Sequence, residues 1–485
     1  MNVRGGSGVN RISVRPVTTL IYFAVLLGIF LSTCSPASAL PAFARKYGMP
    51  CSSCHEAWPM LSPFGQQFKD NGYQMGNDRD APIFQQAAYW PVTFRITPIW
   101  HRESTSSAQV DGSNGPGGNE ARVTTHGFDI SGLDFHTGGT LAKNYSFYVL
   151  PSSDPFASFH FESVWARVDN IAGSTWLNIK LGKFELDNLL SEKRILTLTN
   201  VAGTYENYHF QPVGESSYHI GIGDNQLGVE WMGHSKDDRT RVSASLLSSS
   251  DGQPGLPTCR CYNGYFAASR AFEVGSLGLQ RVGAFAYVGE APTYFQYNLT
   301  TTTQVGTTPD GTPVSSTATN GYAGTGVGNK GFQRYGLIGM WYIKKFDITT
   351  IYFHGHDSAW LGTNTAATPG ALLPAGARAP TWNGGLFESH YMPNPQLMLI
   401  NRYELTRMSQ QAFGGAATTG YTPYAGNLGN ADVLTFGLRY YPFISSRAGF
   451  AYHGEYAIIW QKGVSPVTAS NTATSSLLFG FDFAF

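Results

Sequence analysis

The chain has 485 residues and no formal net charge, since 32 Lys and Arg balance 32 Asp and Glu. Charged residues make up only 13% of it, against about 25% in ordinary soluble proteins, and aromatic residues make up 14%. The balance of charge argues against nucleic-acid binding, and the many aromatic side chains argue against a disordered chain. One large β-barrel with an apolar outer face fits this composition.

Residues 1–39 have the pattern of a secretory signal. Three arginines precede residue 16, an apolar run covers residues 20–31, and Ala37-Ser38-Ala39 offers the small residues of a cleavage site. A membrane anchor is the alternative, but the apolar run is shorter than the ~20 residues needed to span a bilayer. Export would expose Cys259 and Cys261 to oxidising conditions, where they could form a bridge, stay as thiols or hold a metal.

The next segment, residues 40–88, contains the motif Cys51-Ser52-Ser53-Cys54-His55. In a C-x-x-C-H motif the two thiols add to the two vinyl groups of a haem, and the adjacent histidine becomes the proximal iron ligand. Half of a zinc site and a redox C-x-x-C are the alternatives. No second Cys/His pair stands nearby, and no βαβ pattern surrounds the motif, so the sequence predicts one c-type haem on Cys51, Cys54 and His55.

The opposite face of the iron needs a second ligand or an open position. Met49 and Met60 are too close to His55 along the chain to reach around the ring, whereas Met75 could loop back. We therefore predict Met75 as the distal axial ligand; an ordinary packing role for Met75, or a lumen-facing His101 or His453 as ligand, remains open.

A segment of about 50 residues is small for a core of its own. The sequence therefore predicts that residues 40–88 form a short, mostly helical plug inside a barrel or at its mouth.

From residue 89 to residue 485 the chain repeatedly alternates apolar with small or polar residues. The alternation at residues 92–101, 335–352 and 448–460 is typical of strands with lipid on one side and water or a plug on the other. Short turns at residues 141–144 and 344–345 contrast with long loops at residues 299–330 and 362–380. At about 25 residues per strand and connection, the segment holds roughly 16 antiparallel strands.

A soluble β-sandwich is the alternative to the barrel, but it does not explain the end of the chain. Phe479, Phe481, Phe483 and Phe485 alternate up to a terminal phenylalanine. This ending is similar to the C-terminal signal of outer-membrane barrels, so the sequence predicts a location in the outer membrane.

The haem segment resembles the fused cytochrome–porin family, which includes iron-oxidising outer-membrane cytochromes of acidophilic bacteria. The resemblance rests on residues 44–50 before the motif, on Pro63-Phe64-Gly65 and Phe68, and on Asn71-Gly72-Tyr73. It implies a barrel of about 16 strands and electron uptake from extracellular ferrous iron. It also implies delivery to a periplasmic c-type cytochrome or a blue-copper protein of the rusticyanin kind.

Three functions follow as hypotheses. The first is an iron oxidase-type oxidoreductase that takes electrons from ferrous iron and passes them to periplasmic carriers. The second is a transport porin with a haem-bearing plug, and the third is the same conduit running outward to reduce metal oxides. No cluster of iron-binding side chains is evident in the sequence, and outer-sphere transfer to the haem would need none.

Overall fold

We describe a computed structural model of the chain. It describes residues 43, 47, 49, 53–57, 60–73, 92–111, 119–153, 159–186, 225–248, 262–296, 300–307, 313–319, 322–358, 363–364, 381–394, 396–408, 422–423, 431–444, 449–461 and 471–484. The signal predicted at residues 1–39, the haem ligands Cys51 and Met75, and the Cys259–Cys261 pair lie outside these residues. Among the described helices, none is both long and apolar enough to cross a bilayer.

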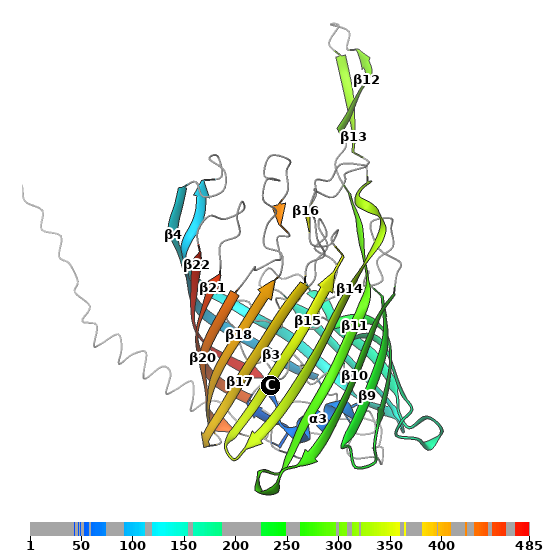
Figure 1. Cartoon of the computed structure of the whole chain (residues 1–485), viewed down its shortest axis with the longest axis vertical. Coiled ribbons are helices and arrows are strands. Elements are labelled where there is room, and N and C mark those ends of the chain that lie inside the picture. The colour runs from blue at the N-terminus through cyan, green and yellow to red at the C-terminus, as the bar shows by residue number, and fades with distance from the viewer. Residues whose placement is uncertain are drawn as a thin grey trace, which may run out of the picture. The chain divides into compact units, whose positions relative to one another are not determined.

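Sixteen strands of the described chain form one closed antiparallel barrel (Figure 1). Its wall follows the chain order from the first strand to the last, and β22 closes it by pairing with β3. The first eight barrel strands are β3 (Val92–Asp111), β4 (Asn119–Ala142), β5 (Tyr145–Ser153), β6 (Phe159–Val168), β7 (Asn178–Glu185), β8 (Asn225–His234), β9 (Thr240–Ser248) and β10 (Tyr262–Glu273). The other eight are β11 (Leu279–Gln296), β14 (Tyr322–Ile343), β15 (Phe346–Asp357), β17 (Thr381–Asn394), β18 (Leu397–Met408), β20 (Ala431–Ile444), β21 (Gly449–Gln461) and β22 (Thr472–Ala484).

Side chains on the outer face of the wall are apolar, and those on the inner face are polar or packed together. Leu181, Leu337 and Phe479 are 60%, 61% and 52% exposed, as a lipid-facing surface requires. Inside the barrel, a cluster of buried apolar side chains covers strands β7, β9–β11, β14, β15 and β17. An even-stranded closed barrel with an apolar outer band has no exposed sheet edge and suits a bilayer. The chain is an outer-membrane β-barrel.

The two rims differ in the length of their connections. Short turns join β4 to β5, β8 to β9 and β14 to β15, and Asn144 and Lys344 in two of these turns adopt left-handed backbone angles. The turns predicted at residues 141–144 and 344–345 are therefore confirmed. Short turns mark the periplasmic rim of such barrels, and long loops mark the extracellular rim.

The long loop predicted at residues 299–330 is wrong in part. Strands β12 (Thr300–Thr307) and β13 (Pro313–Thr319) form a hairpin there, and β14 already begins at Tyr322. Figure 1 shows this hairpin beyond the long-loop rim. Short strands β16 (Thr363–Asn364) and β19 (Thr422–Pro423) pair between two other long connections.

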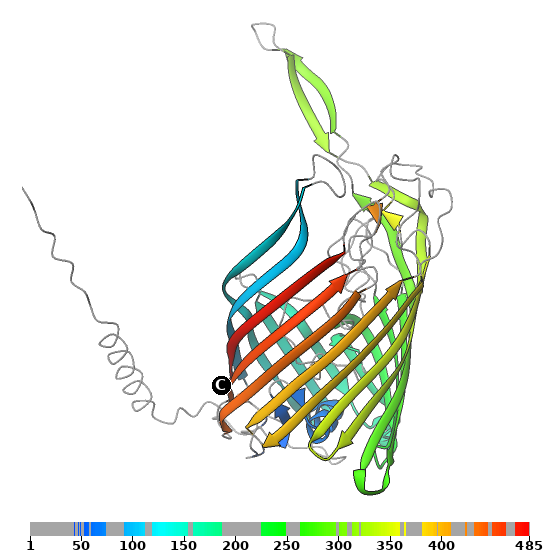
Figure 2. The ribbon, with the colours of Figure 1, turned by 60° about the vertical axis from the view of Figure 1, so that its left-hand side comes forward.

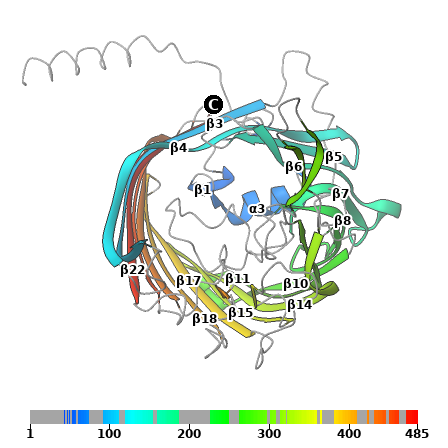
Figure 3. The same cartoon turned by 90° about the horizontal axis from the view of Figure 1, so that it is seen from above.

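The described part of residues 40–88 combines one helix with a small sheet, and the mostly helical plug stays a prediction. Strands β1 (His55–Ala57) and β2 (Met60–Leu61) form a small sheet, and helix α3 (Pro63–Asp70) follows. Figure 3 shows α3 and β1 within the ring of barrel strands, and Figure 2 shows them near the short-turn rim. The first described strand of the barrel starts at Val92.

Candidate functional site

Helix α3 is connected to the C-x-x-C-H motif through the N-cap residue that precedes it. Ser62 is the N-cap, and its side chain accepts a hydrogen bond from the Gly65 amide at 3.1 Å. The same hydroxyl donates to the Ser53 carbonyl at 3.1 Å, and the Ser62 amide donates to the Cys54 carbonyl at 2.8 Å. One capping residue therefore binds the backbone of the motif to the start of the helix.

Gly65 is required where the helix contacts the motif. A Cβ added at Gly65 would lie 1.9 Å from the Cys54 carbonyl oxygen, a separation that no side chain tolerates. The glycine noted in Pro63-Phe64-Gly65 is thus explained by close backbone approach, not by a positive φ angle.

The predicted haem residues are only partly within the described chain. Cys54 is half-buried, and a cysteine thiol is the group that adds to a haem vinyl group. His55 starts β1, where its backbone pairs with Leu61, so the motif ends at the start of a strand. Cys54 followed directly by His55 has the donor chemistry of a c-type haem motif, and the haem itself stays a prediction. The positions of Cys51 and Met75 stay predictions.

Aromatic rings connect the end of α3 to the barrel wall. Tyr73 stacks on Phe43 with ring centroids 4.7 Å apart, on Tyr148 of β5 at 5.2 Å and on Trp165 of β6 at 5.9 Å. Tyr73 has a positive φ of 59°, and Gly72 before it has a φ of 71°. These two left-handed residues turn the chain directly after the helix and direct the Tyr73 ring toward the wall.

Gly72 also has no room for a side chain. A Cβ there would lie 2.6 Å from the Ser146 hydroxyl oxygen of β5, so the turn contacts the wall through its backbone. In the sequence, Asn71-Gly72-Tyr73 served only as a mark of resemblance. The structure gives these residues a docking role.

Charged groups attach the end of α3 to three neighbouring parts of the wall. Lys69 forms an ion pair with Glu185 of β7, and Arg167 of β6 donates to the Asp70 carbonyl at 2.5 Å. The Asp70 carboxylate lies 3.5 Å from the Arg241 guanidinium of β9. Together with the Tyr73 stack, these contacts fix the helix against strands β5 to β9.

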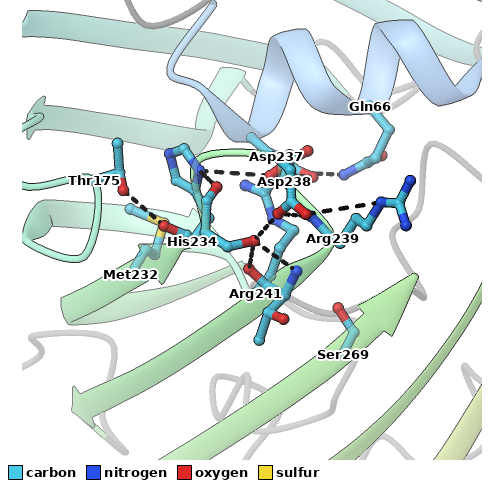
Figure 4. Close-up of polar contacts among 12 residues, drawn as sticks. Gln66, Thr175, Met232, His234, Asp237, Asp238, Arg239, Arg241 and Ser269 are labelled. Carbon is cyan, nitrogen blue, oxygen red and sulfur yellow. Dashed lines mark hydrogen bonds and ion pairs between the residues drawn. The ribbon is translucent and has the colours of Figure 1, made fainter. Parts of the chain in front are cut away.

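The contact with β9 belongs to a charged cluster at the β8–β9 turn (Figure 4). Arg241 pairs with Asp238 at 2.7 Å, and the His234 ring lies 3.7 Å from the same carboxylate. The side-chain amide of Gln66 in α3 donates a hydrogen bond to the Asp70 carboxylate at 2.6 Å. Arg281 of β11 donates to the Asp238 carbonyl at 2.7 Å, so the cluster joins α3 to three strands.

The two aspartates of this turn differ in environment. Burial raises the pKa of Asp238, an effect that Arg241 opposes and the neighbouring Asp70 carboxylate reinforces. The pKa of the exposed Asp237 is lowered, first by the hydrogen bond from the Ser235 hydroxyl and then by the Arg239 amide. Only Asp238 therefore gains affinity for a proton on folding.

Paired charges also line the inner wall away from the helix. Glu388 of β17 binds both His390, at 2.7 Å, and Arg402 of β18. Arg439 of β20 binds Asp482 of β22 at 2.6 Å. Alternation predicts that these side chains point inward, but their pairing across strands depends on register, which the sequence does not reveal.

The alternative distal ligands of the haem point inward as predicted. His453 is 3% exposed and lies 3.3 Å from Asp482, whereas its neighbour Tyr452 is 51% exposed on the outer face. Among the residues that the structure describes, the buried His101 Nδ1 has no hydrogen-bond partner. In the described part of the chain, no three His, Cys, Asp or Glu side chains gather as a metal site would require.

Comparison with known proteins gives only matches of low identity to solved structures. No family model and no curated protein matches the chain. Solved outer-membrane proteins match at low identity. The anion-selective porin of Comamonas acidovorans is 11% identical with a TM-score of 0.46, over 81% of this chain and 99% of the porin. The channel DcaP of Acinetobacter baumannii is 10% identical with a TM-score of 0.45, over 83% and 99%. Pseudomonas putida OprB is 10% identical with a TM-score of 0.42, over 89% and 99%.

Proposed function

We propose that this protein transfers electrons across the outer membrane through one c-type haem attached to residues 40–88. The observation that carries the proposal is the C-x-x-C-H motif in a segment whose helix is bound to the inside of a closed barrel by ion pairs and stacked rings. Residues 40–88 are then a haem-bearing plug. A barrel without redox function would not need a haem-attachment motif.

The chain's own residues have distinct tasks in this proposal. Cys51 and Cys54 would hold the haem by thioether bonds, and His55 and Met75 would bind its iron. Bound in this way, the haem iron supplies a site that gains and loses one electron. Ser62 and Gly65 hold the Cys54 backbone against α3, and the barrel wall separates the segment from lipid.

The proposed electron donor is ferrous iron outside the cell, which makes the protein an iron oxidase-type oxidoreductase. The proposed acceptor is a periplasmic c-type cytochrome or a rusticyanin-like blue-copper protein. The position of α3 near the short-turn rim supports a periplasmic partner, because that rim faces the periplasm in such barrels. Outward transfer to metal oxides would use the same path in reverse.

Haem staining after denaturing electrophoresis tests the attachment. We expect the full-length parent to keep a stained band and the Cys51→Ala/Cys54→Ala variant to lose it, because thioether bonds alone survive denaturation. Replacing His55 should leave the haem attached with an altered spectrum and without iron oxidation. Staining of the double variant equal to that of the parent would refute a haem on this motif.

A redox titration tests the direction of transfer. A strongly positive midpoint fits electron uptake from ferrous iron, which is a weak reductant in acid, whereas a strongly negative midpoint fits metal reduction.

A transport porin with a haem-bearing plug is the second candidate, and the barrel itself favours it. A closed barrel lined by paired charges, such as Arg402 with Glu388, is also how a porin wall is built. Conductance in planar bilayers separates the two functions. A steady conductance in the haem-loaded protein, unchanged when haem attachment is abolished, would favour transport over electron transfer.

A further inference from the structure

An open groove crosses the outer face of the barrel on strands β9, β10, β11, β14 and β15. It encloses about 1190 Å³ and is mostly apolar. Its floor consists of small residues, among them Ala268, Ala284 and Gly339, and Leu337 and Tyr352 border it. In Figure 1 these strands lie side by side on the near face of the barrel. The groove is separate from the haem segment, because its side chains point away from the lumen.

The hollow depends on a glycine in β14. A Cβ at Gly339 would lie 2.6 Å from the Trp341 indole nitrogen and 2.7 Å from the Thr350 hydroxyl oxygen. The indole instead lies across this position and donates to the Thr350 hydroxyl at 3.0 Å. Trp341 stands two residues before the short-turn end of its strand, where tryptophan is enriched at the level of lipid headgroups.

A cationic side chain lies at the same end of the groove. Arg270 is exposed on the outer face of β10, three residues before the short-turn end of the strand. Its guanidinium donates to the Thr240 hydroxyl at 2.5 Å, and it forms no ion pair with any residue of the described chain. The carboxylate of Glu273, at the end of the same strand, is occupied by Arg239 at 2.6 Å.

An arginine on the lipid-facing side of a barrel is stable when it reaches the interface and meets an anion there. The anion at the periplasmic surface of a bilayer is the phosphate of a glycerophospholipid. Such a lipid also has what the groove requires, an apolar chain directly below the phosphate. Charge and shape therefore indicate the same ligand.

We propose that this groove is a specific binding site for one glycerophospholipid of the inner leaflet. Its phosphate binds Arg270 and the Thr240 hydroxyl, and one acyl chain lies over Ala268, Ala284 and Gly339. The site holds the lipid on the outer wall of the barrel and shares β9 with the strands that anchor α3. The proposal depends on the location in the outer membrane and is independent of the haem.

Native mass spectrometry of the full-length protein in detergent tests the site, with dioleoyl phosphatidylglycerol as the added probe. We expect one lipid to remain bound to the parent. Arg270→Gln should weaken binding at least about fivefold, since one arginine near a lipid surface contributes about 1 kcal/mol. Ala284→Phe should abolish binding because the ring fills the exposed floor. Dioleoylglycerol lacks the phosphate. The parent should therefore bind it no more tightly than Arg270→Gln binds the phosphatidylglycerol probe.

Two matched variants serve as controls, and both are exposed on the outer face away from the groove. Arg102→Gln removes another outward arginine, and Ala166→Phe adds a ring to another outward alanine. Both should bind the probe as the parent does, and heat-modifiable migration on gels confirms that each barrel is folded. Equal lipid retention in all variants would overturn the site. A parent oligomer that Ala284→Phe dissociates would also overturn it, because the groove would then be an interface between two copies.

Discussion

Gly65→Ala tests how α3 is attached to the haem motif. The new Cβ would start 1.9 Å from the Cys54 carbonyl oxygen, and contacts under 3.0 Å essentially never occur. Helix and carbonyl must therefore separate by about 1 Å, and neither is the end of a flexible side chain. The Ser62–Cys54 hydrogen bond, now 2.8 Å, would then exceed the limit for such a bond.

The cost can be estimated from the contacts that are lost. One buried backbone hydrogen bond and the overpacking each account for about 1–3 kcal/mol, so the docked state of the segment loses roughly 2–6 kcal/mol. We expect faster proteolysis within residues 40–88 and a lower yield of covalent haem, while the barrel stays folded on heat-modifiable gels. Gln67→Ala, on the exposed face of the same helix, is the matched control and should behave as the parent. Unchanged proteolysis and haem content in Gly65→Ala would refute the close-approach argument.

Three further predictions concern the helix, the charged turn and the end of the chain. Lys69→Met should leave Glu185 without its ion pair, weaken docking by about 1.5–3 kcal/mol and speed proteolysis of the segment; the same rate as in the parent would contradict the contact. Because the pKa of Asp238 is raised on folding, the native state holds its proton more tightly, and stability falls as pH rises above 3.8, the ordinary value for aspartate. Thermal melts between pH 3 and pH 7 should therefore show a smaller loss of stability with rising pH in Asp238→Asn than in the parent. The same loss in both proteins would count against a buried Asp238. Deleting Phe485 should impair membrane insertion, whereas Phe485→Tyr should insert; surface protease accessibility measures both, and normal insertion of the deletion would disprove a terminal signal.

The barrel was predictable because its rule is local. A strand with lipid outside must place an apolar residue at every second position, and this alternation alone placed Tyr452 outside and His453 inside. The estimate of roughly 16 strands is confirmed by the closed barrel. The hairpin β12–β13 was missed because Thr300–Thr307 is polar on both faces, so it lacks the alternation that identifies a strand.

The docking of α3 was not predictable from the sequence. Lys69 and Glu185 are 116 residues apart, and their pairing depends on where the helix lies in the barrel. The strand at His55 was missed for a different reason. The C-x-x-C-H spacing identifies haem ligands but carries no signal for a two-stranded sheet, in which His55 pairs with Leu61 beside the Ser62 cap.

The position of α3 has a consequence for the proposed electron path. Its contacts with the β8–β9 turn hold the segment near the periplasmic rim, so a periplasmic acceptor can approach the haem from outside the barrel. An electron from an extracellular donor would have to cross the length of the lumen to reach the proposed haem. Substitutions of inward charges such as Arg402 and Glu388 should therefore slow reduction of the haem by external iron and leave its oxidation by the acceptor unchanged. Stopped-flow measurement of the two half-reactions separates them, and equal slowing of both would argue against a donor path through the lumen.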